Sequence, residues 1–238
     1  MDIFEKIYRP EAEHCTEDGL LRLLEDAATA HAIRLGIDHD RLLSRYGCIW
    51  MLSRSWYRVP GPPRAGEALQ IQTWVSAAES WGSWRAHRIG ENGESLELWV
   101  LADVETRKLV PISRIPMPEG AALEAGRTLP PKVPPLRGGE PIGSFTVEEA
   151  DLDINGHMNN TRYVRRALAL LRGAADCPDF FPELRVTYSR ECRLGEAIAL
   201  TAERRPEGFL LCGCGPEGKP RFGVWASGYS QASHTSGQ

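Results

Sequence analysis

The chain has 238 residues, 42% of them hydrophobic, and a formal net charge of −4 with both signs mixed along its length. This length allows one large domain or two small ones, and the mildly acidic balance argues against binding to nucleic acid or electrostatic attachment to a membrane. The N-terminus lacks a hydrophobic signal region, no apolar run reaches membrane-spanning length, and six irregularly spaced cysteines indicate free thiols, so we expect a cytoplasmic protein.

The first half of the chain predicts a strand, a long helix and then several strands. Residues 3–8 fit a strand, and residues 18–35 carry an apolar stripe at helical spacing, with Thr16 as N-cap and Gly36 as the stop signal. Strands are expected next at residues 50–59, 68–77, 82–90 and 94–104, the last continuing to 109–111.

The second half repeats this order after a Pro- and Gly-rich linker at residues 129–139. A strand is expected near residues 144–147 and a helix at 159–172 with Asn159 as N-cap, followed by strands near 183–191, 197–204, 208–213 and 221–229. Residues 232–238 are typical of a disordered tail. The pattern predicts an α+β fold in which an antiparallel sheet curls around a central helix, twice in one chain.

Three polar side chains, Asp153, Asn155 and His157, alternate just before the second helix. In an extended segment this spacing points all three to one side. The adjacent helix N-terminus supplies backbone N–H groups that suit a developing oxyanion. We therefore consider a catalytic site here. The alternative is that Asp153 and Asn155 form turns or caps and that His157 is a surface histidine.

A second candidate pair, Glu191 and Cys192, follows the strand expected at residues 183–191. Adjacent residues of a strand face opposite sides, and parity places Cys192 on the apolar face. A cysteine on such a face is most often a small buried residue, so we favour Glu191 as the catalytic partner. The rival is a papain-like arrangement in which Cys192 is the nucleophile beside His157 and Asn155.

The order of these motifs resembles the acyl-ACP thioesterases of plants and bacteria. That family carries Asp-x-Asn-x-His-Val-Asn-Asn, present here at residues 153–160 with Met158 for Val, and then a strand ending in Arg-Glu-Cys, present at 190–192. Residues 50–54, 66–76 and 105–109 also resemble strand segments of the family. The resemblance covers most of the chain in the right order.

The resemblance implies a tandem double hotdog: two antiparallel curled sheets, each wrapped around a central helix, joined back to back. Residues 1–128 would form an N-terminal hotdog that binds the acyl chain, residues 129–139 the linker, and residues 140–231 the catalytic hotdog. The implied activity is hydrolysis of fatty acyl-acyl carrier protein, which releases free fatty acid and terminates chain elongation. It requires no metal and no organic cofactor. The implied partner is acyl carrier protein with its phosphopantetheine-linked acyl chain.

Thioester hydrolysis assigns roles to the four polar residues. Asp153 or Glu191 would orient or deprotonate a water, Asn155 would donate to the carbonyl oxygen, and His157 would donate to it or take a proton. The alternatives are a hotdog acyl-CoA thioesterase with the same residues and a non-catalytic acyl-binding regulator.

Three further features bear on partners and metals. A basic face on the second helix is a candidate dock for the acidic carrier protein, formed by Arg162, Arg165 and Arg166. Hotdog units often pair further, so a homodimer is one alternative for the oligomeric state. The isolated pair Cys212 and Cys214 cannot close a tetrahedral zinc site and indicates a buried structural role.

Overall fold

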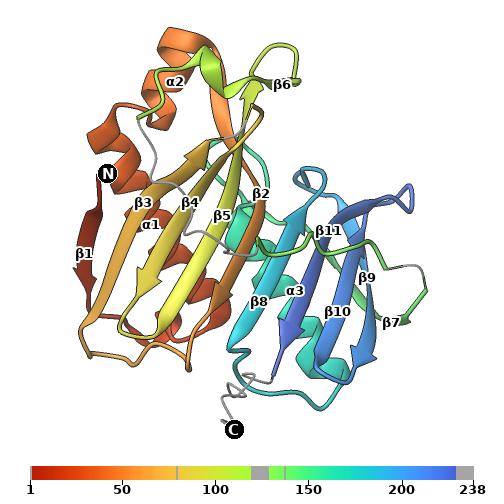
Figure 1. Cartoon of the computed structure of the whole chain (residues 1–238). Helices are drawn as coiled ribbons and strands as arrows, with labels where there is room; N and C mark the ends of the chain where they lie inside the picture. The colour runs from red at the N-terminus through yellow and green to blue at the C-terminus, as the bar shows by residue number, and fades with distance from the viewer. Residues whose placement is uncertain (1, 79, 119–128, 137, 229–238) are drawn as a thin grey trace, which may run out of the picture.

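The computed structural model describes residues 2–78, 80–118, 129–136 and 138–228, which form one 11-stranded antiparallel sheet with the long helices behind it (Figure 1). The first half, up to residue 118, contains β1 (Phe4–Tyr8), α1 (Glu17–Leu35), α2 (His39–Tyr46), β2 (Cys48–Arg58), β3 (Leu69–Ala78), β4 (Ser83–Ile89), β5 (Gly93–Asp103) and β6 (Leu109–Val110). The second half, from residue 129, contains β7 (Glu140–Thr146), α3 (Asn160–Ala174), β8 (Glu183–Tyr188), β9 (Ala197–Arg205), β10 (Gly208–Cys214) and β11 (Pro220–Ser227).

The strand order shows that the two halves share one topology. It runs β1-β3-β4-β5-β2 in the first half and continues β8-β11-β10-β9-β7 in the second, with β6 paired to β5. Each half therefore contributes a strand, a helix and four further strands in the same spatial order, which confirms the double hotdog. Of the expected elements, β8 is shorter than predicted, and the short helix α2 was not predicted.

The two half-sheets are joined edge to edge. Strand β2 pairs with β8 in antiparallel register, from Arg54 opposite Thr187 to Arg58 opposite Glu183. The expected back-to-back joint is therefore wrong, and the physical reason lies in the strand edges. In each half, β2 or β8 would otherwise present a row of unpaired backbone N–H and C=O groups, and mutual pairing covers both edges.

A shared core holds the helices against the sheet and against each other. Helix α1 contacts both α3 and β3, and the large cluster includes Leu20 and Leu24 of α1 together with Leu168 and Leu171 of α3, all at most 1% exposed. Full burial of such a side chain contributes about 1.5–3 kcal/mol. This packing holds α3 beside α1.

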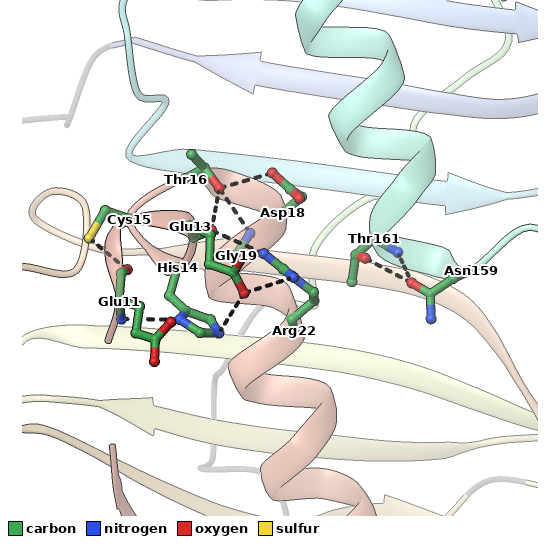
Figure 2. A network of polar contacts seen from close by, with 10 residues as sticks. All are labelled: Glu11, Glu13, His14, Cys15, Thr16, Asp18, Gly19, Arg22, Asn159 and Thr161. Carbon is green, nitrogen blue, oxygen red and sulfur yellow. Dashed lines mark hydrogen bonds and ion pairs between the residues drawn. The ribbon is translucent and has the colours of Figure 1, made fainter. Parts of the chain in front are cut away.

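Side-chain caps define where both long helices begin (Figure 2). The hydroxyl of Thr16 accepts a hydrogen bond from the backbone N–H of Gly19 (3.2 Å), and Oδ1 of Asn159 accepts one from the N–H of Thr161 (2.9 Å). Helix α1 ends at Gly36, whose left-handed backbone (φ +75°) favours glycine. All three predicted boundary residues are thus confirmed.

We expect opposite effects from two glycine substitutions inside helices. At Gly19 of α1, an added Cβ would meet the backbone oxygen of Glu13 and Cα of His14, neither of which belongs to a flexible side chain. Gly19→Ala should therefore destabilise the protein by about 1–3 kcal/mol. At Gly173 of α3 nothing lies within 4 Å of an added Cβ, so Gly173→Ala should stabilise by about 0.5–1 kcal/mol. Urea denaturation of both variants measures these changes; stabilisation by Gly19→Ala would contradict the close approach.

No helix in the described part of the chain is long and apolar enough to cross a membrane. The tail predicted at residues 232–238 lies outside the described residues.

Candidate active site

The segment from Asp153 to His157 forms a tight turn. Oδ1 of Asp153 accepts hydrogen bonds from the backbone N–H groups of Asn155 (2.8 Å) and His157 (3.1 Å). Leu152 and Met158, on either side, pair in an antiparallel bridge, and Gly156 takes the left-handed conformation (φ +75°) that closes the turn. The extended segment predicted from the two-residue spacing is therefore wrong. Asp153 holds the turn, which was the alternative role considered for it.

The chain after β8 returns to this turn and brings a carboxylate to His157. Strand β8 ends at Tyr188, so Glu191 and Cys192 lie in the following loop and not in the predicted strand. The N–H of Met158 donates to the carbonyl of Cys192 (2.9 Å), and His157 forms a bridge with Arg193. This pairing places Oε2 of Glu191 3.1 Å from Nε2 of His157. The contact is shielded, because the side chains are 28% and 11% exposed, respectively.

A cavity of about 120 Å³ brings the four favoured site residues together: its lining includes Asp153, Asn155, His157 and Glu191. Residues 49–52 of β2 border it from the first half. The structure therefore collects at one cavity a histidine–carboxylate pair and an amide donor. This set can deprotonate a water and stabilise a developing oxyanion.

Cys192 does not line the cavity that Asn155, His157 and Glu191 share. Cys192 is fully buried, and its backbone N–H donates to the hydroxyl of Tyr163 (2.9 Å). Burial raises the pKa of its thiol to about 12, although the contact with Tyr163 opposes this shift. The reactive form of a cysteine is the thiolate, so this environment disfavours Cys192 as a nucleophile.

The structure adds Arg107 to the site, a residue that the sequence did not indicate as functional. Its Nη2 lies 3.5 Å from Nε2 of His157, and its Nη1 lies 3.9 Å from Oε1 of Glu191. Arg107 comes from the loop between β5 and β6 and has a left-handed backbone (φ +57°), which is uncommon for a residue with a side chain. Among the described residues, it is the only non-glycine with positive φ. The first half thus supplies a cation to a site built mainly by the second.

Removing this cation should weaken the site without abolishing it. We expect Arg107→Asn to lower kcat about tenfold, equivalent to roughly 1.4 kcal/mol, because Glu191 and His157 lose the guanidinium that positions them. Asparagine tolerates the left-handed backbone, so the loop should keep its shape. Arg107→Lys should recover part of kcat, with KM little changed. Lys108→Asn is the matched control, and equal loss in both variants would point to a disturbed loop.

A separate, largely apolar cavity of about 390 Å³ adjoins the site from the first half. Four residues border both cavities: Trp50, Asp153, Asn155 and Asn160. Its walls include Ala28 and Ala32 of α1 and Val75 and Trp99 of the sheet. A chain attached to a group at Asn155 can therefore continue between α1 and the sheet of the first half.

The basic face predicted on α3 is smaller than expected. Arg166 pairs with Asp151 (2.7 Å) and Glu148 (2.6 Å), so its charge is balanced within the chain. Arg165 is exposed and Arg162 is half-buried. Two of the three cations thus remain for a docking role.

All six cysteines are free, as expected. Cys212 is buried, and its sulfur lies 3.8 Å from that of Cys214. In the described ranges, no group of three or more His, Cys, Asp or Glu side chains is arranged to hold a metal ion.

Comparison with known proteins identifies the family. Residues 11–115 match the acyl-ACP thioesterase N-terminal domain, and residues 140–216 match the acyl-ACP thioesterase C-terminal domain. The two matches together cover most of the chain in the expected order. The chain belongs to the acyl-ACP thioesterase family.

Curated relatives are longer plant proteins. The chain is 27% identical over 218 residues to the chloroplastic dodecanoyl-(acyl-carrier-protein) hydrolase of Cinnamomum camphora, covering 79% of this chain and 55% of that protein. It is 22% identical over 211 residues to the chloroplastic oleoyl-acyl carrier protein thioesterase 1 of Arabidopsis thaliana, covering 77% and 57%, respectively. The chain thus spans little more than half the length of these relatives.

Solved structures share the whole architecture. An acyl-ACP thioesterase from Bacteroides thetaiotaomicron superposes with a TM-score of 0.80 at 19% identity, over 94% of this chain and 97% of that one. The 12:0-ACP thioesterase from Umbellularia californica gives a TM-score of 0.76 at 17% identity, over 94% and 96%. At these identities the likeness establishes the fold.

Proposed function

We propose that this protein hydrolyses the thioester of a fatty acyl chain carried on acyl carrier protein, releasing free fatty acid and terminating elongation. The observation that carries the proposal is the 3.1 Å contact between His157 and Glu191. The cavity at this contact is also lined by Asn155, and it adjoins a largely apolar cavity that can take an acyl chain. Membership of the acyl-ACP thioesterase family supports the same chemistry.

In the proposed reaction, a water beside Glu191 and His157 gives up a proton to this pair as its oxygen attacks the thioester carbonyl carbon. The electron pair displaced onto the carbonyl oxygen is stabilised by the amide N–H of Asn155. When the tetrahedral intermediate collapses, the C–S bond breaks, and the phosphopantetheine thiolate leaves and takes up the proton that the His157–Glu191 pair had accepted from the water. Asp153 acts by positioning Asn155 and His157 through the turn. Arg107 keeps the histidine–carboxylate pair in place.

The division of labour in this proposal places the acyl chain in the first half and the chemistry in the second. It is supported by the walls of the larger cavity, which come from α1 and the first-half sheet. A cytoplasmic location and docking through Arg162 and Arg165 belong to the same proposal. The six free cysteines are compatible with a reducing compartment. The oligomeric state, including a homodimer, has no part in the proposed chemistry.

The test is free-thiol release from acyl-ACP and acyl-CoA, measured side by side at matched chain length. The expected result is a higher kcat/KM for acyl-ACP. The Glu191→Gln variant, purified in the same way, gives the thiol release caused by contaminating enzymes. This background is subtracted from the release measured with the parent protein. A higher kcat/KM for acyl-CoA would favour the acyl-CoA thioesterase alternative. Release no faster than the Glu191→Gln background from either substrate would favour a non-catalytic acyl-binding protein.

A further inference from the structure

The first-half sheet turns an unusually polar face toward α1. Strand β4 pairs with β5 so that Arg85 lies opposite Glu97 and His87 lies opposite Ser95. All four side chains are buried, with exposures between 0% and 7%. Burying polar groups costs free energy unless they find partners, so the partners of this face bear on what the adjoining cavity binds.

Arg85 is the member of this face that borders the larger cavity. Its Nη1 donates toward Nδ1 of His31 (3.0 Å) and to the hydroxyl of Thr73 (3.1 Å), and Arg85 lines the same cavity as Asn155. A guanidinium has five N–H donors, and both of these described bonds use the same nitrogen. A substrate oxygen beside Arg85 would therefore meet a strong, charge-assisted donor.

The charges around Arg85 determine whether a carboxylate or a hydroxyl oxygen of the substrate can bind beside it. Glu97 lies opposite it; burial opposes its ionisation, but contacts with His87 and Trp99 hold its pKa below the ordinary value. Burial and the charge of Arg85 lower the pKa of His31 to about 4, so this histidine is neutral at pH 7. Glu97, which lies opposite Arg85 and contacts Nε2 of His87 (3.3 Å), would repel a second carboxylate on the substrate. It would not repel a neutral hydroxyl.

Neighbouring polar atoms are also short of partners. Among the described residues, the buried hydroxyls of Ser55 and Ser95 and Nδ1 of His87 have no hydrogen-bond partner. A small void bordered by Glu25, Ser55 and Glu97 shares Glu25 with the larger cavity. Burial, and then repulsion by Glu97, raise the pKa of Glu25 to about 7, so its carboxyl can act as donor or acceptor near neutrality. The region can therefore satisfy a group that both donates and accepts.

We infer that the acyl chain accepted by this protein carries a hydroxyl group, and that Arg85 donates a hydrogen bond to its oxygen. The inference rests on the proposed thioester hydrolysis and adds the substrate class. Selectivity follows because a hydroxyl beside Arg85 gains a charge-assisted hydrogen bond that a plain chain cannot form. A site built to bond a hydroxyl discriminates strongly against the analogue that lacks it.

The experiment compares acyl-ACPs in pairs of equal chain length, with and without one hydroxyl placed near the thioester, at mid-chain or at the methyl end. We expect kcat/KM for the best hydroxyacyl chain to exceed that of its plain partner by about tenfold or more. Arg85→Met removes the donors at similar length and should reduce the preference for the hydroxyacyl chain to about threefold or less. Arg88→Met is the matched control, since Arg88 is exposed on the other face of β4.

Several outcomes would overturn the inference. These are a preference of the parent protein for the plain chain at every length, a preference for a chain ending in a carboxylate, and equal loss on both substrates in a folded Arg85→Met variant. If Arg85→Met does not fold, calorimetry decides: Glu191→Gln should bind free hydroxy fatty acids about tenfold more tightly than plain ones. Equal binding would overturn the inference. Absence of thiol release from every acyl-ACP would instead contradict the proposed hydrolysis, and calorimetry would still test the substrate class.

Discussion

Replacing Glu191 with Gln is expected to lower kcat/KM for acyl-ACP about a hundredfold or more. Glutamine preserves the shape of the side chain but cannot accept the proton of an attacking water. The carboxylate lies 3.1 Å from Nε2 of His157, so its loss also removes the charge that favours a protonated imidazole during the reaction. A hundredfold decrease corresponds to about 2.7 kcal/mol of transition-state stabilisation.

The control for this substitution is Glu149→Gln, which makes the same chemical change at an exposed glutamate in the short 3-10 helix before the site. It should leave kcat/KM unchanged. Circular dichroism and urea denaturation of both variants establish that the fold is intact. A folded Glu191→Gln protein that retains more than about a tenth of the parent activity would exclude Glu191 as the base.

The second large effect is expected at Asn155. Its side chain is exposed at the turn and borders both cavities, where an amide N–H can reach a carbonyl oxygen. Asn155→Ala removes this donor and should lower kcat about a hundredfold, because a bond to the oxyanion strengthens as charge develops. KM should change little, since the lost interaction is made mainly in the transition state.

Asn92→Ala is the matched control, because Asn92 is an exposed asparagine in the turn between β4 and β5. It should retain full activity. An Asn155→Ala variant with raised KM and unchanged kcat would show that the amide binds the ground state, and the carbonyl would then need a different donor.

The fold was predictable because its signals are local. Apolar spacing indicates the two long helices, and capping residues mark their ends: Thr16 and Asn159 where α1 and α3 begin, and Gly36 where α1 ends. Each of these residues acts on backbone groups only a few positions away in the chain. Helix α2 was missed although Asp38 caps it, because its eight residues show only a short apolar pattern. The edge-to-edge pairing of β2 with β8 could not be predicted from hydrophobic periodicity. Periodicity indicates which side chains of a strand face the core, but not which other strand pairs with it.

The site was predictable as a set of residues but not as a geometry. Strand spacing failed at residues 153–157 because the Asp153 carboxylate bonds to two backbone N–H groups and turns the chain. The contact of Glu191 with His157 depends on pairing between two distant segments, and the position of Arg107 depends on how the two halves meet. Such contacts leave no signal in local sequence.

The most direct test of the account is thiol release by Cys192→Ala beside Glu191→Gln in one assay. In the proposed mechanism, a water activated by Glu191 and His157 attacks the thioester, while Cys192 is a buried packing residue. Cys192→Ala should therefore retain activity within about tenfold of the parent, and Glu191→Gln should lose about a hundredfold or more. An inactive but folded Cys192→Ala beside an active Glu191→Gln, or an acyl group trapped on Cys192, would contradict the account and identify the thiol as the nucleophile.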